Sequence, residues 1–172
     1  MAMANYNNKR ERIIVCGGIN LLHEMKIQDF NHWRMKNLAV RLDISGQDLS
    51  GKNLSGVHLN GVSCVGTNLS YCNLTRANFV QAQLSFANLE GANLSDALFM
   101  FSEMKKCNLI NSDLSRTNFI YANLEDSNIT NSKTSETIFV RADLRGANLT
   151  GMNKNTLYLK YAGLDGNDDY FI

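Results

Sequence analysis

The sequence lacks proline altogether and holds few cysteines, and these absences exclude several classes of protein. None of the 172 residues is proline and only four are cysteine, so collagen-like chains and disulfide scaffolds are excluded. No run approaches the roughly 18 apolar residues of a membrane span. The apolar stretch 13–19 is broken by Gly17 and Gly18, which argues against a signal peptide. We therefore predict a cytoplasmic protein that does not bind a membrane.

The sequence also lacks a strong excess of charge of either sign. Its net charge is +1, with seven Lys/Arg and three Asp/Glu in residues 1–41 and ten and thirteen in residues 42–172. These two parts carry net charges of about +4 and −3, and neither charge is large enough to attract nucleic acid. No direct nucleic-acid binding is expected.

What the sequence does contain is a period of five residues. Steps of five from Ile44 to Leu164 visit 25 positions, and only Thr134 and Lys154 break the nonpolar series. This period matches neither a helix nor a strand, so it predicts a solenoid. We call these positions the centres of the repeats.

The residues before each centre are as regular as the centres themselves. The position two before is nearly always small, as in Ala77 and Ala92, and the position just before is usually Asn or Asp, as in Asn78 and Asn93. We infer that the chain turns every five residues. The centre and the small residue then point inward, while Asn or Asp bonds nearby backbone at the turn.

This pattern resembles the pentapeptide-repeat family over residues 42–166, as in the segments 77–81, 92–96 and 147–151. The resemblance implies a right-handed quadrilateral β-helix with four repeats per coil. An independent check is that Phe occupies the centres 79, 99, 119 and 139 and no others, so a coil of twenty residues stacks the four rings. We predict an all-β solenoid of about six coils with a short, partly helical N-terminal cap.

We divide the chain into a capping segment (1–41), the β-helix (42–166) and a C-terminal tail (167–172). Within the cap we expect a strand at 13–16 and short helices over 20–26 and 29–38. Lys154 falls in the same column as Thr134, and because an inward lysine is costly, we expect a bulge there.

Opposite charges twenty residues apart indicate the same register. They form two columns of alternating sign: Lys105, Glu125, Arg145 and Asp165, and Arg76, Asp96, Arg116 and Glu136.

The residues that usually carry chemistry form no catalytic, cofactor or metal motif. Cys64, Cys72 and Cys107 occupy inward positions and are expected to be buried thiols, while Cys16 has no assigned role. No Cys-x-x-Cys occurs, and His23, His32 and His58 lack metal-site spacing. We expect no enzyme activity and no cofactor.

The main candidate for function is a hydrophobic surface. Eight outward positions in the middle coils are aliphatic, and six of them share the face outside the Phe column. A run of Phe101, Tyr121, Arg141 and Tyr161 follows the adjoining corner. The predicted protein-interface residues are Val80, Leu98, Met100, Phe101, Ile120, Tyr121, Ile138 and Val140. This face could form a homodimer or bind another protein, or the N-terminal segment could cover it.

We therefore favour a non-enzymatic protein-binding scaffold whose partner the sequence does not name. The resemblance implies two alternatives. One is a DNA mimic that protects DNA gyrase, giving quinolone resistance or toxin immunity, and the other is a bacterial effector or regulatory protein. Mimicry requires a strongly acidic surface, which the mixed charges of this chain disfavour. Gyrase-protecting members also dimerise through a C-terminal helix, and residues 165–172 are too few for one.

Overall fold

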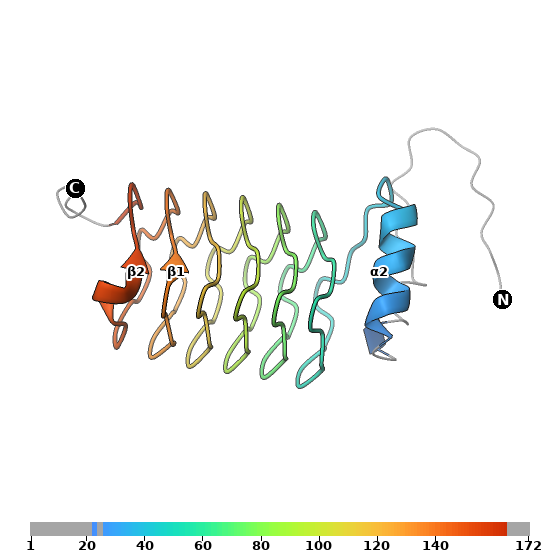
Figure 1. Ribbon diagram of the computed structural model, residues 1–172, viewed down its shortest axis with the longest axis horizontal. Coiled ribbons are helices and arrows are strands. Elements are labelled where there is room, and N and C mark those ends of the chain that lie inside the picture. Colours follow the sequence, from blue (N-terminus) through green and yellow to red (C-terminus); the bar gives the residue numbers. More distant parts are fainter. Residues whose placement is uncertain (1–21, 24–25, 165–172) are drawn as a thin grey trace.

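The structure is a computed structural model that describes residues 22–23 and 26–164. A helix, α2 (Ile27–Lys36), precedes a long row of similar coils, and Figure 1 shows these coils stacked side by side with α2 across one end. The named elements near the other end are β1 (Thr137–Ile138), the 3₁₀ helix η1 (Lys154–Thr156) and β2 (Leu157–Tyr158).

Parallel pairing at intervals of twenty residues builds the coils. The bridges run from Asp43 with Ser63 to Asp143 with Gly163, and β1 pairs with β2 in the same register. Each side of a coil contributes only one or two paired residues between turns, so most sides are too short to be named strands. Four such sides in twenty residues make the four-sided coil that the resemblance implied.

Each corner is a turn with one residue in the left-handed region. The N–H of the residue three after a centre donates to the carbonyl of that centre, as from Ala122 to Phe119 at 2.9 Å. The residue two after the centre has a positive φ, for example 56° at Tyr121 and 63° at Gly91. Side chains at this position therefore leave the corner toward solvent, and Tyr121 is one of them.

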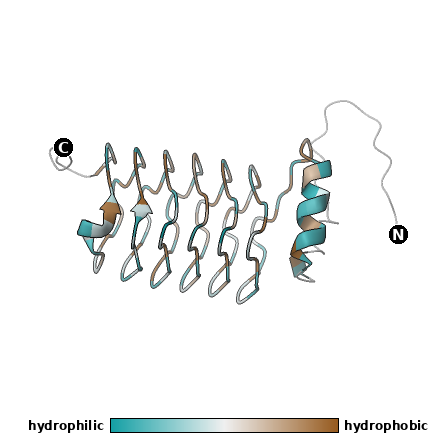
Figure 2. Ribbon diagram, viewed as in Figure 1, coloured by the Kyte–Doolittle hydropathy of each residue, from teal (hydrophilic) through white to brown (hydrophobic). Residues whose placement is uncertain are grey.

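The interior consists of the centres and the small residues. Phe79, Phe99, Phe119 and Phe139 are all 0% exposed, and their rings stack with centroids 4.8, 5.2 and 5.0 Å apart in sequence order. The predicted Phe column is confirmed. Figure 2 shows hydrophobic and hydrophilic residues alternating along the coils, as one inward and one outward set require.

Polar residues in the small positions bond to the backbone of the preceding coil. Thr67, Thr117 and Ser127 are buried, and their hydroxyls donate to carbonyls 23 residues earlier at 2.7–2.9 Å. The Asn and Asp residues before the centres accept from the N–H two residues later, as Asn118 does from Ile120 at 2.9 Å. These bonds confirm the local role expected of Asn and Asp.

α2 covers the open edge of the first coils. Its Phe30 is fully buried, and Asn31 forms a pair of bonds with the edge, donating to the Gly56 carbonyl at 2.8 Å and accepting from the His58 N–H at 2.9 Å. Arg34 is 4% exposed and donates to the carbonyls of Val40 and Asn60 at 3.1 and 3.0 Å. The backbone edge of a β-helix otherwise stays unpaired, so these contacts stabilise its end.

The observed helix lies two residues earlier than predicted, since it begins at Ile27 and ends at Lys36 instead of spanning 29–38. Of the helix expected over 20–26, the structure describes Leu22 and His23 as helical and Lys26 as outside the helix. The strand expected at 13–16, Cys16 and the tail 167–172 lie outside the described residues.

The repeat becomes irregular where Lys154 was expected to disturb it. η1 replaces the regular side at this place, and the Thr156 hydroxyl donates to the Thr134 carbonyl at 3.2 Å. Pairing then resumes at Thr137 and Leu157. The expected departure from the repeat is therefore a single 3₁₀ turn.

The structure describes three of the four residues in the charge column that begins at Lys105. Lys105 pairs with Glu125 at 2.6 Å as predicted. The Lys105 side chain lowers the pKa of Glu125, and the charge of Arg145 adds a smaller contribution, as expected for neighbours in this column. Arg145 also forms an ion pair with Asp143, two residues earlier, where its Nε donates to Oδ1 at 2.8 Å. Asp165 lies outside the described residues.

Candidate functional site

The structure places all eight predicted interface residues on one surface. Bridges join Asn78, Leu98, Asn118, Ile138 and Tyr158 in order, which aligns the repeats of this face in register. The six aliphatic members are half-buried, whereas Phe101 is 53% exposed and Tyr121 45%. We call these eight residues the apolar strip; they are Val80, Leu98, Met100, Phe101, Ile120, Tyr121, Ile138 and Val140.

The local chain geometry explains why these apolar side chains face outward. Leu98 and Met100 flank the buried Phe99, and neighbours of an inward residue in an extended segment point to the opposite side. Backbone pairing occupies the polar groups of the same segment, because the Phe99 N–H donates to the Asn118 carbonyl at 2.8 Å. The surface of the strip is therefore made mainly of side chains.

One edge of the strip is a stack of three rings and one cation, which we call the aromatic column: Phe101, Tyr121, Arg141 and Tyr161. The rings of Phe101 and Tyr121 stack with centroids 5.1 Å apart. The Arg141 guanidinium lies 5.4 Å from the ring centroids of both Tyr121 and Tyr161, and it donates to the Tyr121 hydroxyl at 2.7 Å. These contacts hold the exposed rings in fixed positions, which lowers the entropy cost of binding through them.

The surface extends further toward the C-terminal end than the sequence predicted. Tyr158 is 57% exposed and paired in register with Ile138, and Lys160 lies 5.2 Å from the Tyr161 ring centroid. The spacing of twenty residues from Ile138 could have revealed Tyr158. Among the described residues, eight large apolar side chains are exposed, and four of them lie on this surface: Phe101, Tyr121, Tyr158 and Tyr161.

The opposite edge of the strip is charged, and we call it the charged column: Arg76, Asp96, Arg116 and Glu136. Arg116 and Asp96 form a bidentate pair at 2.7 and 2.9 Å. The Arg116 guanidinium lowers the pKa of Asp96, with a smaller contribution from Arg76. The hydrogen bond and the charge of Asp96 raise the pKa of Arg116, and the charge of Glu136 adds a smaller contribution. Neighbouring charges in the column therefore attract each other.

The described cysteine thiols lie where they are poor nucleophiles. Cys64, Cys72 and Cys107 are buried and unbridged, and burial raises the pKa of each thiol, to about 12 at Cys107. Residues 22–23 and 26–164 hold no cluster of three His, Cys, Asp or Glu that could bind a metal. In the same part of the chain, no helix combines the length and apolar character that a bilayer crossing requires.

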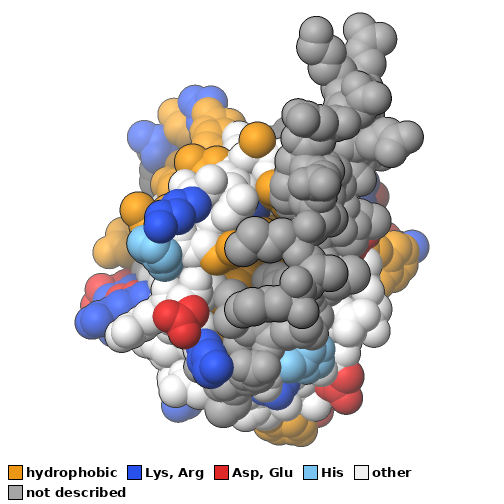
Figure 3. Space-filling view, turned by 90° about the vertical axis from the view of Figure 1, so that its right-hand side faces the viewer, with side chains coloured by type: hydrophobic (Ala, Val, Ile, Leu, Met, Phe, Trp, Pro, Cys, Tyr) orange, Lys and Arg blue, Asp and Glu red, His pale blue; other side chains and the backbone are white. Residues whose placement is uncertain are grey.

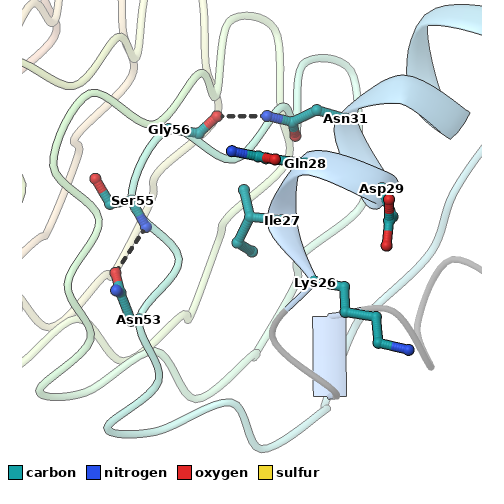
Figure 4. A pocket seen from close by; sticks show the side chains of 8 residues that line it. All are labelled: Lys26, Ile27, Gln28, Asp29, Asn31, Asn53, Ser55 and Gly56. Atoms are coloured by element: carbon teal, nitrogen blue, oxygen red, sulfur yellow. Dashed lines mark hydrogen bonds between the residues drawn. The ribbon is translucent and has the colours of Figure 1, made fainter.

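A groove of about 710 Å³ lies between α2 and the first coils. Figure 4 shows Ile27, Gln28 and Asn31 on the side of α2 that faces Ser55 and Gly56, whereas the side chains of Lys26 and Asp29 point away from them. Asn31 is already bonded to Gly56, so part of the groove lining serves to attach the helix. Seen from this end, acidic and basic side chains are interspersed among neutral ones (Figure 3).

Several solved structures resemble the chain. A pentapeptide repeat protein of the Arabidopsis thaliana thylakoid lumen is 27% identical, with 58% of this chain and 70% of that chain covered and a TM-score of 0.46. QnrB1, a plasmid-mediated fluoroquinolone resistance protein, is 16% identical, with coverages of 73% and 90% and a TM-score of 0.37. HetL, involved in heterocyst differentiation regulation in the cyanobacterium Nostoc, is 20% identical, with coverages of 73% and 78% and a TM-score of 0.27.

Among curated proteins no match was found. The family model for pentapeptide repeats, in contrast, matches eight copies in overlapping segments from residue 41 to residue 153. Together with the twenty-residue register, this match leads to one conclusion: the chain belongs to the pentapeptide-repeat family, whose members form right-handed quadrilateral β-helices.

Proposed function

We propose that the chain is a non-enzymatic scaffold, a β-helix of about six coils that binds a protein through the apolar strip. The observation that carries this proposal is the strip itself, an ordered row of aliphatic side chains bordered by exposed stacked rings. Apolar side chains gathered on one face of a water-facing surface usually form an interface, and aromatic residues and arginine are enriched in such contacts. Members of this family are generally structural or binding scaffolds.

We further propose the division into a capping segment (1–41), a β-helix (42–166) and a tail (167–172), in a cytoplasmic protein. The contacts of Asn31 and Arg34 with the edge of the first coils support the capping role. The unbridged Cys64, Cys72 and Cys107 are compatible with a reducing compartment.

Photo-crosslinking in the native host tests the proposed function. A benzophenone analogue of phenylalanine replaces Phe101 in one variant and Phe86 in a matched control. Both residues are exposed, 53% and 62%, and both have a positive φ at a corner, but Phe86 lies off the strip. We expect protein crosslinks at least about ten times stronger at Phe101, measured on immunoblots. Equal or absent crosslinking at the two positions would refute the proposal.

Protection of DNA gyrase is the second candidate, implied by the family. Duplex DNA presents regular negative charge, whereas the acidic groups here alternate with basic ones, as in the pairs of Asp96 with Arg116 and Asp113 with Lys133. We therefore expect no protection of gyrase supercoiling from a quinolone at a tenfold excess of this protein. Restored supercoiling in that assay would reverse the ranking of the two functions.

A further inference from the structure

The charged column has a property that identifies a partner for the apolar strip. From the N-terminal end it reads plus, minus, plus, minus (Arg76, Asp96, Arg116, Glu136), and from the C-terminal end it reads minus, plus, minus, plus. If a second copy lies antiparallel to the first, each charge of its column therefore lies opposite a charge of the other sign. The column is complementary to itself in this one orientation.

The orientation corresponds to a twofold axis across the strip, between the coils of Asp96 and Arg116. Because a twofold axis perpendicular to the rod keeps the charged columns on the same side, they face each other. Arg76 then lies opposite the partner subunit's Glu136, and Asp96 lies opposite the partner subunit's Arg116. Symmetry repeats each pair, so all four charges of both copies find an opposite charge.

The same axis brings apolar side chains together. Met100 lies opposite the partner subunit's Ile120, and Val80 opposite the partner subunit's Val140. In the aromatic column, Phe101 meets the partner subunit's Tyr121. The rings are already stacked within each copy at 5.1 Å, so they present a preformed surface.

Other arrangements of two copies place groups face to face that repel each other or do not pair. A shift by one coil places Arg116 opposite itself and Asp96 opposite Glu136, and like charges at an interface are strongly unfavourable. A parallel arrangement places the charged column against the aromatic column. Glu136 then meets the partner subunit's Arg141, but Asp96 meets Phe101 and Arg76 meets Gln81, so only one of the four charges in the column finds an opposite charge.

We propose that the partner at the apolar strip is a second copy of this chain, docked antiparallel about a twofold axis between the coils of Asp96 and Arg116. This inference rests on the proposed function, because it names the occupant of the same surface. Of the described residues before the repeats, α2 lies across the end of the rod (Figure 1), where its Asn31 bonds to Gly56 and His58.

Sedimentation equilibrium of the full chain tests the stoichiometry. We expect twice the chain mass of 19.2 kDa for the wild type and a dissociation constant raised at least about 30-fold by Ile120→Glu. Ile110→Glu is the matched control, because Ile110 has the same repeat position and the same bond from its N–H to an Asn side chain, but lies on the opposite face. Circular dichroism confirms that both variants fold.

Disulfide crosslinking tests the orientation without changing the strip. One preparation carries Arg76→Cys, a second, tagged preparation carries Glu136→Cys, and both carry Cys16→Ser. Mixed under mild oxidation, they should form a crosslinked heterodimer, while neither forms crosslinks alone. Within one chain the two positions are three coils or about 14 Å apart, beyond the reach of a disulfide. A mixture of Asp96→Cys and Glu136→Cys would crosslink only if the two copies were shifted by one coil. We expect it to stay monomeric on a non-reducing gel.

The outcomes separate this inference from the proposed function. A wild type that sediments as a monomer at every concentration, or a dimer unaffected by Ile120→Glu, overturns the inference. Crosslinking of Asp96→Cys with Glu136→Cys but not of Arg76→Cys with Glu136→Cys overturns the proposed register. In each case, photo-crosslinks at Phe101 to a different protein would leave the scaffold function standing, and their absence would remove both.

Discussion

Replacing Phe99 with alanine is expected to lower the free energy of unfolding by about 3–5 kcal/mol. The Phe99 ring is fully buried and stacks on Phe79 at 4.8 Å and on Phe119 at 5.2 Å, so the substitution removes two ring contacts and leaves a cavity inside a continuous column. Chemical denaturation monitored by circular dichroism measures the change.

Phe101→Ala is the control, because Phe101 is only two residues away but is 53% exposed. Its loss should cost less than about 1 kcal/mol in the monomer. Equal costs at the two positions would contradict the assignment of Phe99 to the interior. Phe99→Leu restores the usual residue of a centre, and we expect it to recover part of the loss because leucine fills part of the cavity.

Replacing Arg34 with methionine is expected to lower the free energy of unfolding by about 2–4 kcal/mol. The guanidinium is buried and donates to the carbonyls of Val40 and Asn60, so an apolar side chain of similar length leaves both acceptors without this donor. Hydrogen exchange should locate the loss of protection mainly in α2 and the first coil, since each coil of a solenoid is stabilised by its neighbours.

Lys36→Met provides the comparison on the same helix, because Lys36 is exposed and its substitution should change stability by less than about 0.5 kcal/mol. If Arg34→Met behaved like Lys36→Met, α2 would not stabilise the edge through its buried guanidinium.

The repeat was predictable because the centres, the small residues and the Asn or Asp residues all recur with the same period of five. The Phe spacing predicted the stack, and the same spacing placed six residues of the apolar strip on one face and Phe101 and Tyr121 on its adjoining corner. The assignment of that strip as an interface stays a prediction until its binding is measured.

The cap was predictable only as a segment outside the repeat. Its attachment depends on Asn31 and Arg34, which contact residues 25 to 27 positions away in a pattern without a period. The additional contact of Arg145 with Asp143 was missed for a related reason, because a contact between residues two apart depends on side-chain geometry and not on the period. Tyr158 was missed because it follows directly after the irregular turn at η1.

The twenty-residue register also limits how the length of such a chain can change. An insertion of twenty residues lengthens the rod by one coil and keeps every face intact, whereas an insertion of five residues rotates all later repeats by a quarter-turn and divides the apolar strip between two faces. A single added coil, moreover, gives the charged column an odd number of members, and no odd alternating series can match its own reverse. Changes in length would therefore preserve self-recognition only in steps of two coils.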